Sequence, residues 1–136
     1  MAKIETIEGI GPKNRKQLAK AGVTTTQGLL KAGGAKAGRK QLAKDSGCTE
    51  KELLGWVNRA DLMRVRGVGE EYSDLLEASG VDTVKELRTR KPVNLHAKML
   101  EVNTAKKRRL VRRPPSLSEV ERWVAHAKEL KPAVSH

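Results

Sequence analysis

The sequence predicts an all-α protein in which two similar helical repeats pack as one compact body. Apolar residues recur at intervals of three and four positions, and no segment alternates apolar and polar residues as a half-buried strand would. A glycine motif occurs twice at a fixed spacing, which indicates an internal repeat. The length of 136 residues suits one compact domain or two small units that share a core.

The repeat is clearest in an apolar-x-Gly-apolar-Gly motif at residues 7–11, which recurs at residues 65–69. The same offset of 58 positions relates Leu18 to Leu76 and continues through the Gly-Val pair that follows each of these leucines. The predicted units are a first repeat at 1–60, a second repeat at 61–130 and a C-terminal tail at 131–136. We expect the tail to fray.

Pro12 fits the first turn of a helix directly after the first motif, because its missing amide would have no partner there. The helices predicted for the first repeat cover 2–7, 12–21, 25–32, 36–46 and 50–62. Those of the second repeat cover 60–65, 70–79, 83–90, 93–104 and 117–130. Since the helix over 50–62 leads straight into the second motif, we expect one rigid body without a linker.

The last helix of each repeat begins with a capping box, in which a hydroxyl and a carboxylate satisfy free amides at the helix start. Thr49 and Glu52 form the first box, and Ser116 and Glu119 form the second. The boxes are 67 positions apart rather than 58, so the second repeat contains a net insertion of nine residues.

The glycine motif predicts a tight turn between two helices. Glycine adopts the backbone conformations of such a turn without a side-chain penalty and leaves the amides uncovered. The amides of Gly9, Ile10 and Gly11, with the positive end of a helix dipole behind them, would form an anion site suited to a phosphate. The apolar residue between the glycines, Ile10 or Val68, is expected to point into the core.

Residues 4–23, and again residues 62–81, resemble the helix-hairpin-helix motif of DNA repair, recombination and replication proteins. Over nearly the whole chain the arrangement is similar to an uncharacterised bacterial family with two helix-hairpin-helix repeats. The resemblance implies sequence-independent contact with the phosphates of double-stranded DNA through the amides of the hairpin. In that family the residues just past the second glycine neutralise phosphate, and Lys13 occupies this position here.

The formal charge of +12, from 28 Lys and Arg against 16 Asp and Glu, favours nucleic acid as the partner. The helix after the first motif is basic, whereas the helix after the second carries four carboxylates that would repel phosphate within a Debye length of about 8 to 10 Å. The predicted contacts of the first repeat are Gly9, Ile10, Gly11, Lys13, Arg15, Lys16 and Lys20. The second hairpin, Gly67, Val68 and Gly69, is predicted to be structural or a weak contact.

A further basic feature lies in the insertion, which we place at about 105–115. It holds six basic residues within 106–113 and ends in two prolines. We interpret it as a flexible arm that follows the phosphate backbone and makes the affinity strongly salt-dependent. Its predicted contacts are Lys106, Lys107, Arg108, Arg109, Arg112 and Arg113.

Other classes of function find little support. Trp56 and Trp123 have equivalent places after the two capping boxes, so we expect both to pack in the core and not to stack on bases. A glycosylase of this hairpin class would need a catalytic Asp in a larger body with a base-sized pocket. We predict no catalytic residue, no metal, no cofactor, no small-molecule substrate and no membrane contact. With one cysteine and no signal-peptide pattern, a cytoplasmic protein is expected.

The sequence therefore predicts non-catalytic, largely sequence-independent binding of DNA, with double-stranded DNA as the preferred partner. A protein–protein interaction or scaffold module built on the same fold is the main alternative, and RNA binding is a third. The residues leave open the choice of nucleic acid structure, the protein partner and the oligomeric state.

Overall fold

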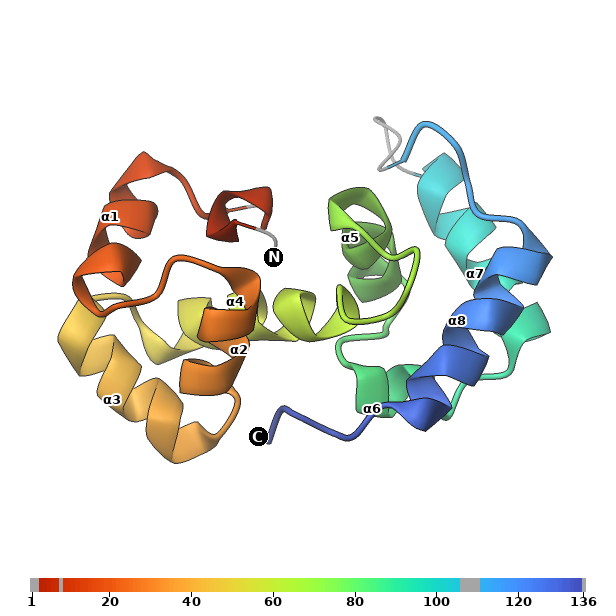
Figure 1. The fold of residues 1–136 in the computed structure, drawn as a ribbon. Coiled ribbons are helices and arrows are strands. Elements are labelled where there is room, and N and C mark those ends of the chain that lie inside the picture. The colour runs from red at the N-terminus through yellow and green to blue at the C-terminus, as the bar shows by residue number, and fades with distance from the viewer. Residues whose placement is uncertain (1–2, 8, 106–110, 136) are drawn as a thin grey trace. The chain divides into compact units, whose positions relative to one another are not determined.

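The computed structural model describes residues 3–7, 9–105 and 111–135, and these residues form an all-α protein, as predicted (Figure 1). They contain eight α-helices, one 3-10 helix (η1) and no strand; the backbones of Lys3 and Thr25 pair in a single isolated bridge. The bounds are η1 Ile4–Thr6, α1 Pro12–Lys20, α2 Thr26–Gly33, α3 Lys36–Ser46, α4 Glu50–Leu62, α5 Glu70–Ala78, α6 Val84–Leu87, α7 Pro92–Ala105 and α8 Leu117–Glu129.

Most predicted helices agree with the observed ones to within two residues at each end, and three predictions were wrong in part. The first predicted helix forms only the 3-10 helix η1. The helix expected over 60–65 is not separate, because α4 continues to Leu62 and the chain then turns, with the Val65 amide donating to the Leu62 carbonyl at 3.1 Å. The helix expected over 83–90 shortens to α6, after which the Thr89 and Arg90 amides donate to the Glu86 and Leu87 carbonyls, at 3.1 Å each, in tight turns rather than helical bonds.

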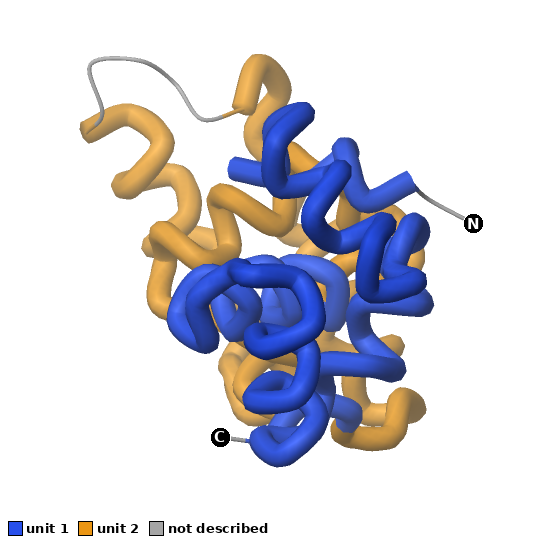
Figure 2. Tube along the Cα trace, turned by 90° about the vertical axis from the view of Figure 1, so that its left-hand side faces the viewer, with its two compact units in different colours: residues 1–61, 133–136 blue, residues 62–132 orange. Residues whose placement is uncertain are grey.

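The described chain divides into two compact units, drawn in blue and orange in Figure 2. Unit 1 comprises Met1–Asp61 with Ala133–His136, and unit 2 comprises Leu62–Pro132. Helices α1 to α3 and all but the last residue of α4 belong to unit 1, and α5 to α8 belong to unit 2.

In unit 1, α3 packs against both α1 and α2. The side chains of Ile4, Leu18, Leu29 and Leu53 are fully buried, so η1 and α1 contribute to one core with α2 and α4. Apolar burial of this kind supplies most of the stability of a small helical unit.

A buried arginine ties the C-terminal residues into unit 1. Arg39 is 4% exposed, and its Nη1 donates to the carbonyl oxygens of Gly33 and Gly34 at 2.9 and 2.8 Å. Its Nη2 donates to the carbonyl of Ser135, whose amide donates in turn to the Gly34 carbonyl at 2.9 Å. The expectation that the tail frays was therefore wrong at Ser135, because its backbone is bonded to a buried cation and to Gly34, the residue that follows α2.

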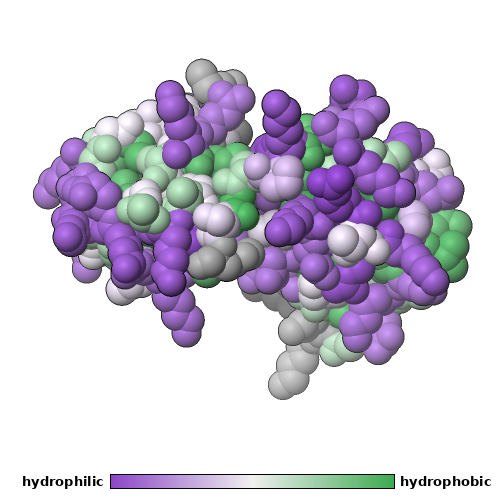
Figure 3. Space-filling view, turned by 90° about the horizontal axis from the view of Figure 1, so that it is seen from below, coloured by the Kyte–Doolittle hydropathy of each residue, from purple (hydrophilic) through white to green (hydrophobic). Residues whose placement is uncertain are grey.

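In unit 2, α7 packs against α5 and α8, and α6 packs against α8. Trp123 is 2% exposed in this core, and its ring lies 5.0 Å from that of Tyr72, centroid to centroid. Trp56 is 7% exposed in unit 1, so the prediction that both tryptophans are core residues is confirmed. On the face shown in Figure 3 hydrophilic residues predominate and apolar residues form smaller patches.

Both predicted capping boxes are confirmed. The Glu52 amide donates to Thr49 Oγ1 at 3.1 Å, and the Thr49 amide donates to Glu52 Oε1 at 3.1 Å. At the start of α8, the corresponding bonds between Ser116 and Glu119 are 3.2 and 3.0 Å. Each box fixes the start of the helix that holds the tryptophan of its unit.

Candidate nucleic-acid interface

Two turns with matching backbone geometry precede α1 and α5. We call them the first glycine turn, marked by Gly9 and Gly11, and the second glycine turn, marked by Gly67 and Gly69. Gly9 and Gly67 have positive φ angles of 93° and 90°. Gly11 and Gly69 have extended backbone, with φ of −85° and −103°, and stand at the N-caps of α1 and α5. The backbone of the two turns is therefore alike at equivalent glycines.

The hydrogen bonds within the turns match as well. The Ile10 amide donates to the Ile7 carbonyl at 3.2 Å, and the Val68 amide donates to the Val65 carbonyl at 3.0 Å. The Ile10 amide, one of the three phosphate donors expected from the sequence, is thus used inside the turn. The side chains of Ile10 and Val68 are each 5% exposed, which confirms that they point into the cores.

The first glycine of each turn is required by its own unit. A positive φ near 90° is strained for any residue with a side chain. In addition, a Cβ atom at Gly9 would lie 3.3 Å from Trp56 Nε1, and one at Gly67 would lie 3.1 Å from Trp123 Nε1. The buried tryptophan of each unit therefore packs against the first glycine of its turn.

The second glycine of each turn has no such reason in the described residues. The backbone of Gly11 and Gly69 is open to any residue, and a Cβ atom at either would meet nothing within 4 Å. No side chain of the described residues caps α1 or α5, whereas Thr25 and Thr83 cap α2 and α6. The amides at the starts of α1 and α5 therefore have no side-chain cap among the described residues, although Pro12 itself has no amide; free amides at a helix start can bind an anion.

The four basic residues predicted on α1 are all exposed, and none of them forms an ion pair within the described part of the chain. Because successive residues of an α-helix turn by about 100°, Lys13, Lys16 and Lys20 share one side of α1 and Arg15 lies on another. Asn14 fixes the start of the helix to the turn, since its Nδ2 donates to the Gly9 carbonyl at 3.2 Å. Lys13 thus lies in the first turn of α1, close to Gly11, whereas Lys20 lies in the last turn.

Arg15 and Lys16 also border a hollow of about 540 Å³ in unit 1. Lys3, on the segment that precedes η1, also borders this hollow. The sequence pattern gave no reason to select Lys3, because it lies outside the glycine motif and reaches α1 only through the folding of unit 1.

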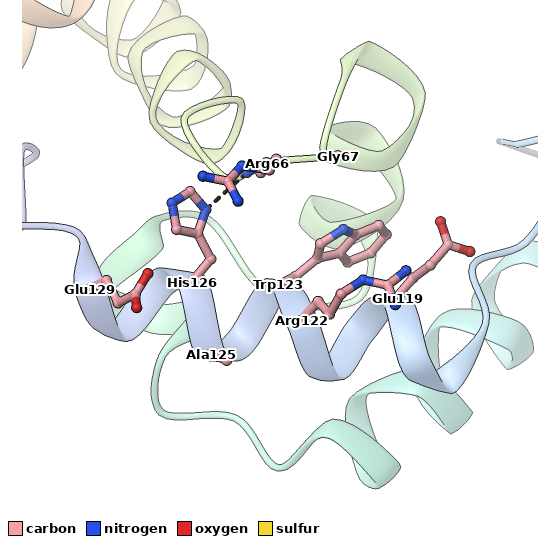
Figure 4. Close-up of a pocket in the computed structure, with 8 residues that line it drawn as sticks. All are labelled: Arg66, Gly67, Glu119, Arg122, Trp123, Ala125, His126 and Glu129. Carbon is pink, nitrogen blue, oxygen red and sulfur yellow. Dashed lines mark hydrogen bonds between the residues drawn. The ribbon is translucent and has the colours of Figure 1, made fainter.

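Helix α5 presents the opposite charge at the same places. Glu71 stands 58 positions after Lys13, and Glu70, Glu71 and Glu77 are exposed. The second glycine turn is held from α8, where His126 Nδ1 accepts a hydrogen bond from the Arg66 amide at 3.0 Å (Figure 4). A hollow of about 370 Å³ opens there, and Figure 4 shows its border residues, Arg66, Gly67, Glu119, Arg122, Trp123, Ala125, His126 and Glu129.

Part of the predicted basic arm lies outside the described residues, namely Lys106, Lys107, Arg108 and Arg109. Its described end is anchored. Val111 is 1% exposed, and its amide donates to Asn103 Oδ1 at 3.1 Å. Arg112 is exposed, as a phosphate contact would require.

Arg113, the last of the predicted arm contacts, is engaged within unit 2. Its Nη1 and Nη2 donate to the two carboxylate oxygens of Glu119 at 2.9 Å each. These bonds, with that from the Ser116 amide, lower the pKa of Glu119 to about 2, and the carboxylate raises the pKa of Arg113 above its ordinary value. The Arg113 carbonyl also accepts from the Tyr72 hydroxyl at 2.9 Å. Arg113 thus neutralises a carboxylate of its own unit.

Comparison with protein families assigns most of the chain to one family. Residues 8–130 match the family described as Domain of unknown function (DUF4332), and the chain belongs to that family. Searches of curated proteins and of solved structures found no match. Among the described residues, no helix is both long enough and apolar enough to cross a membrane.

Proposed function

We propose that this protein binds double-stranded DNA without catalysis and largely without sequence specificity, and that its two glycine turns are the hairpins of tandem helix-hairpin-helix repeats. The observation that carries the proposal is the start of α1. There an uncapped helix begins at a glycine that neither backbone conformation nor packing requires, and four exposed cations follow it.

A phosphate at this position would accept hydrogen bonds from the free amides of Gly11 and the first turn of α1. The partial positive charge of a helix start favours an anion at that point. Lys13 lies two residues after Gly11 and forms no ion pair with a carboxylate of the described residues. Because the Ile10 amide is used within the turn, the donors in this proposal are the other amides of the turn and the start of α1.

Contacts to phosphate carry no sequence information, so the proposed binding is non-specific. Affinities of this kind are roughly 10⁻⁴ to 10⁻⁶ M at physiological salt. Further phosphate contacts would come from Lys16, Lys20 and Arg112, and each contact would increase the salt dependence of binding. We assign the second glycine turn a structural role, because Glu70 and Glu71 stand where α1 has Pro12 and Lys13.

The test is a titration of a fluorescent DNA duplex at several salt concentrations with the wild type and with Lys13→Glu. We expect Lys13→Glu to weaken binding about tenfold and to reduce the salt slope by about 1, since one phosphate contact is lost. Lys44→Glu is the matched control, because Lys44 is an exposed lysine on α3 that takes no part in the proposed site.

An equal loss in Lys13→Glu and Lys44→Glu would contradict the proposal, because the affinity would then follow net charge and not the turn. A duplex of RNA in parallel decides between the two polymers: equal affinity and an equal effect of Lys13→Glu would assign the site to duplexes in general. Wild-type binding that is absent or independent of salt would leave a protein-interaction module as the function of the fold.

A further inference from the structure

The hollow that α1 borders is lined by residues that lie outside the first glycine turn. It lies within unit 1, measures about 540 Å³, and holds three cations and a single carboxylate. The residues that border it are Lys3, Glu5, Arg15, Lys16, Ala19, Thr24 and Thr25.

Backbone contacts fix one side of this hollow. The Lys3–Thr25 bridge and the bond from the Ile4 amide to the Thr24 carbonyl, at 3.3 Å, hold the N-terminal segment beside the loop that precedes α2. Thr25 Oγ1 accepts from the Gly28 amide at 3.0 Å, so its hydroxyl proton remains to be donated. The hollow therefore has a wall fixed by backbone contacts, which carries a hydroxyl donor and Lys3, and its other border residues lie on α1.

The cations of the hollow are not used elsewhere in unit 1. Lys3, Arg15 and Lys16 are exposed, and none forms an ion pair in the ranges that the structure describes. Cations gathered around one concave surface all attract an anion that enters it, and the anion also relieves their mutual repulsion. An arginine among them offers the paired N–H groups that bind phosphate oxygens.

The equivalent positions of unit 2 carry the reverse charge. At an offset of 58, Lys3 corresponds to Asp61, Lys16 to Asp74, and Arg15 to a buried serine. Ala19 and Thr24 likewise correspond to Glu77 and Asp82. The shared backbone therefore does not demand a basic hollow, and its cations occur only in the unit whose turn is also followed by cations.

We propose that this hollow binds a second phosphate group of the nucleic acid that the first glycine turn contacts, with Arg15 and Lys3 as its principal ligands. The inference rests on the proposed function and extends it. On α1, which with its side chains is about 10 to 12 Å in diameter, Lys13 and Arg15 lie on different sides, and Lys16 lies between them at the border of the hollow. Two phosphates held there would fix the direction of the backbone across unit 1.

The double variant Lys3→Gln/Arg15→Gln tests the hollow, with Lys44→Gln/Lys40→Gln as a control that removes the same charge from exposed positions of α3. We expect the double variant to weaken duplex binding about tenfold and to lower the salt slope by about 1, while the control changes neither as much. Arg15→Lys should keep the slope and lose about threefold in affinity, because it keeps the charge and loses the paired donors.

Duplexes with and without 5′-phosphates distinguish the two sources of the phosphate. An equal effect on both assigns the hollow to phosphodiesters within the strand, and an effect confined to phosphorylated ends assigns it to a terminal phosphate. Wild-type affinity in the double variant overturns the inference. If Lys13→Glu still weakens binding in that case, the proposed function stands without the hollow; if neither variant matters, both fall.

Discussion

The starts of α1 and α5 have the same backbone and opposite charge. Each follows a turn whose first glycine has a φ near +90° and lies against a buried tryptophan, and each begins at an extended glycine with open space around it. Lys13 follows in one unit and Glu71 in the other. Both units thus share the packing of the turn, and under the proposed function the side chains that follow the turn decide which unit binds phosphate.

The largest expected effect tests the shared packing. Gly67→Ala should lower the free energy of unfolding by about 2 kcal/mol, because alanine is strained at this φ and its methyl would meet the indole of Trp123. Gly9→Ala should cost slightly less, since the distance to Trp56 Nε1 is 3.3 Å rather than 3.1 Å. Urea unfolding followed by tryptophan fluorescence measures both.

Gly55→Ala on α4 is the control for that experiment. Gly55 lies inside a helix, where a Cβ atom would meet nothing within 4 Å, so alanine there should stabilise the protein by about 0.5 to 1 kcal/mol. Losses below about 0.5 kcal/mol in both Gly9→Ala and Gly67→Ala would show that the tryptophans do not require these glycines.

A charge reversal at the start of α5 would make it resemble the start of α1. Glu71→Lys gives the second glycine turn the cation that the first has, so we expect duplex affinity to rise up to about fivefold, which is near the upper limit for one exposed charge pair. Glu121→Lys makes the same charge change at an exposed position on α8. An equal gain in the two variants would indicate that only net charge matters and that the turn adds nothing.

Local patterns predicted most of the fold. The capping hydroxyls, Pro12 and the glycines mark helix ends within a few residues, and the tryptophans show by equal placement that they belong to the cores. Local sequence patterns did not reveal the role of Arg39 or the anchoring of the C-terminal residues. A charged residue is expected at the surface, and nothing near Arg39 in sequence reveals that its guanidinium binds the carbonyl of Ser135.

The candidate site was predictable to a smaller extent, for the same reason. Lys13 follows from a motif, and its exposure on α1 agrees with that interpretation. Lys3 borders the same hollow as Arg15, although its backbone pairs with Thr25, and Arg113 bonds to Glu119, which lies six residues further on in α8. Whether a basic residue is available to a ligand depends on its partners in space, which a count of charges does not show.

Arg113 and Glu119 give a smaller, pH-dependent effect. The pKa of Glu119, about 2, lies below its ordinary value of 4.5, so this carboxylate stabilises the fold above pH 4.5 and loses that contribution as the pH falls toward 2. Arg113→Gln removes the main cause of the shift and should flatten the fall in stability over this window. The effect is modest, because the Arg113 side chain is 68% exposed.

Urea midpoints at pH 7 and pH 3 measure this difference, with Arg112→Gln as the control. Arg112 is the neighbouring exposed arginine and makes no ion pair within the described residues, so its loss should leave the fall in stability unchanged. A fall between pH 7 and pH 3 as steep in Arg113→Gln as in the wild type would refute the role of the pair.

The smallest expected effect separates the two turns most directly. Gly11→Ala and Gly69→Ala introduce the same methyl at equivalent, extended and unobstructed positions, so each should change the free energy of unfolding by no more than about 0.5 kcal/mol. If phosphate approaches α1 alone, Gly11→Ala weakens duplex binding about threefold and Gly69→Ala does not change it. Equal losses would mean that both turns contact the backbone despite the carboxylates of α5. No loss in either would mean that phosphate does not approach the glycine at all, and the cations of α1 would then act without the turn.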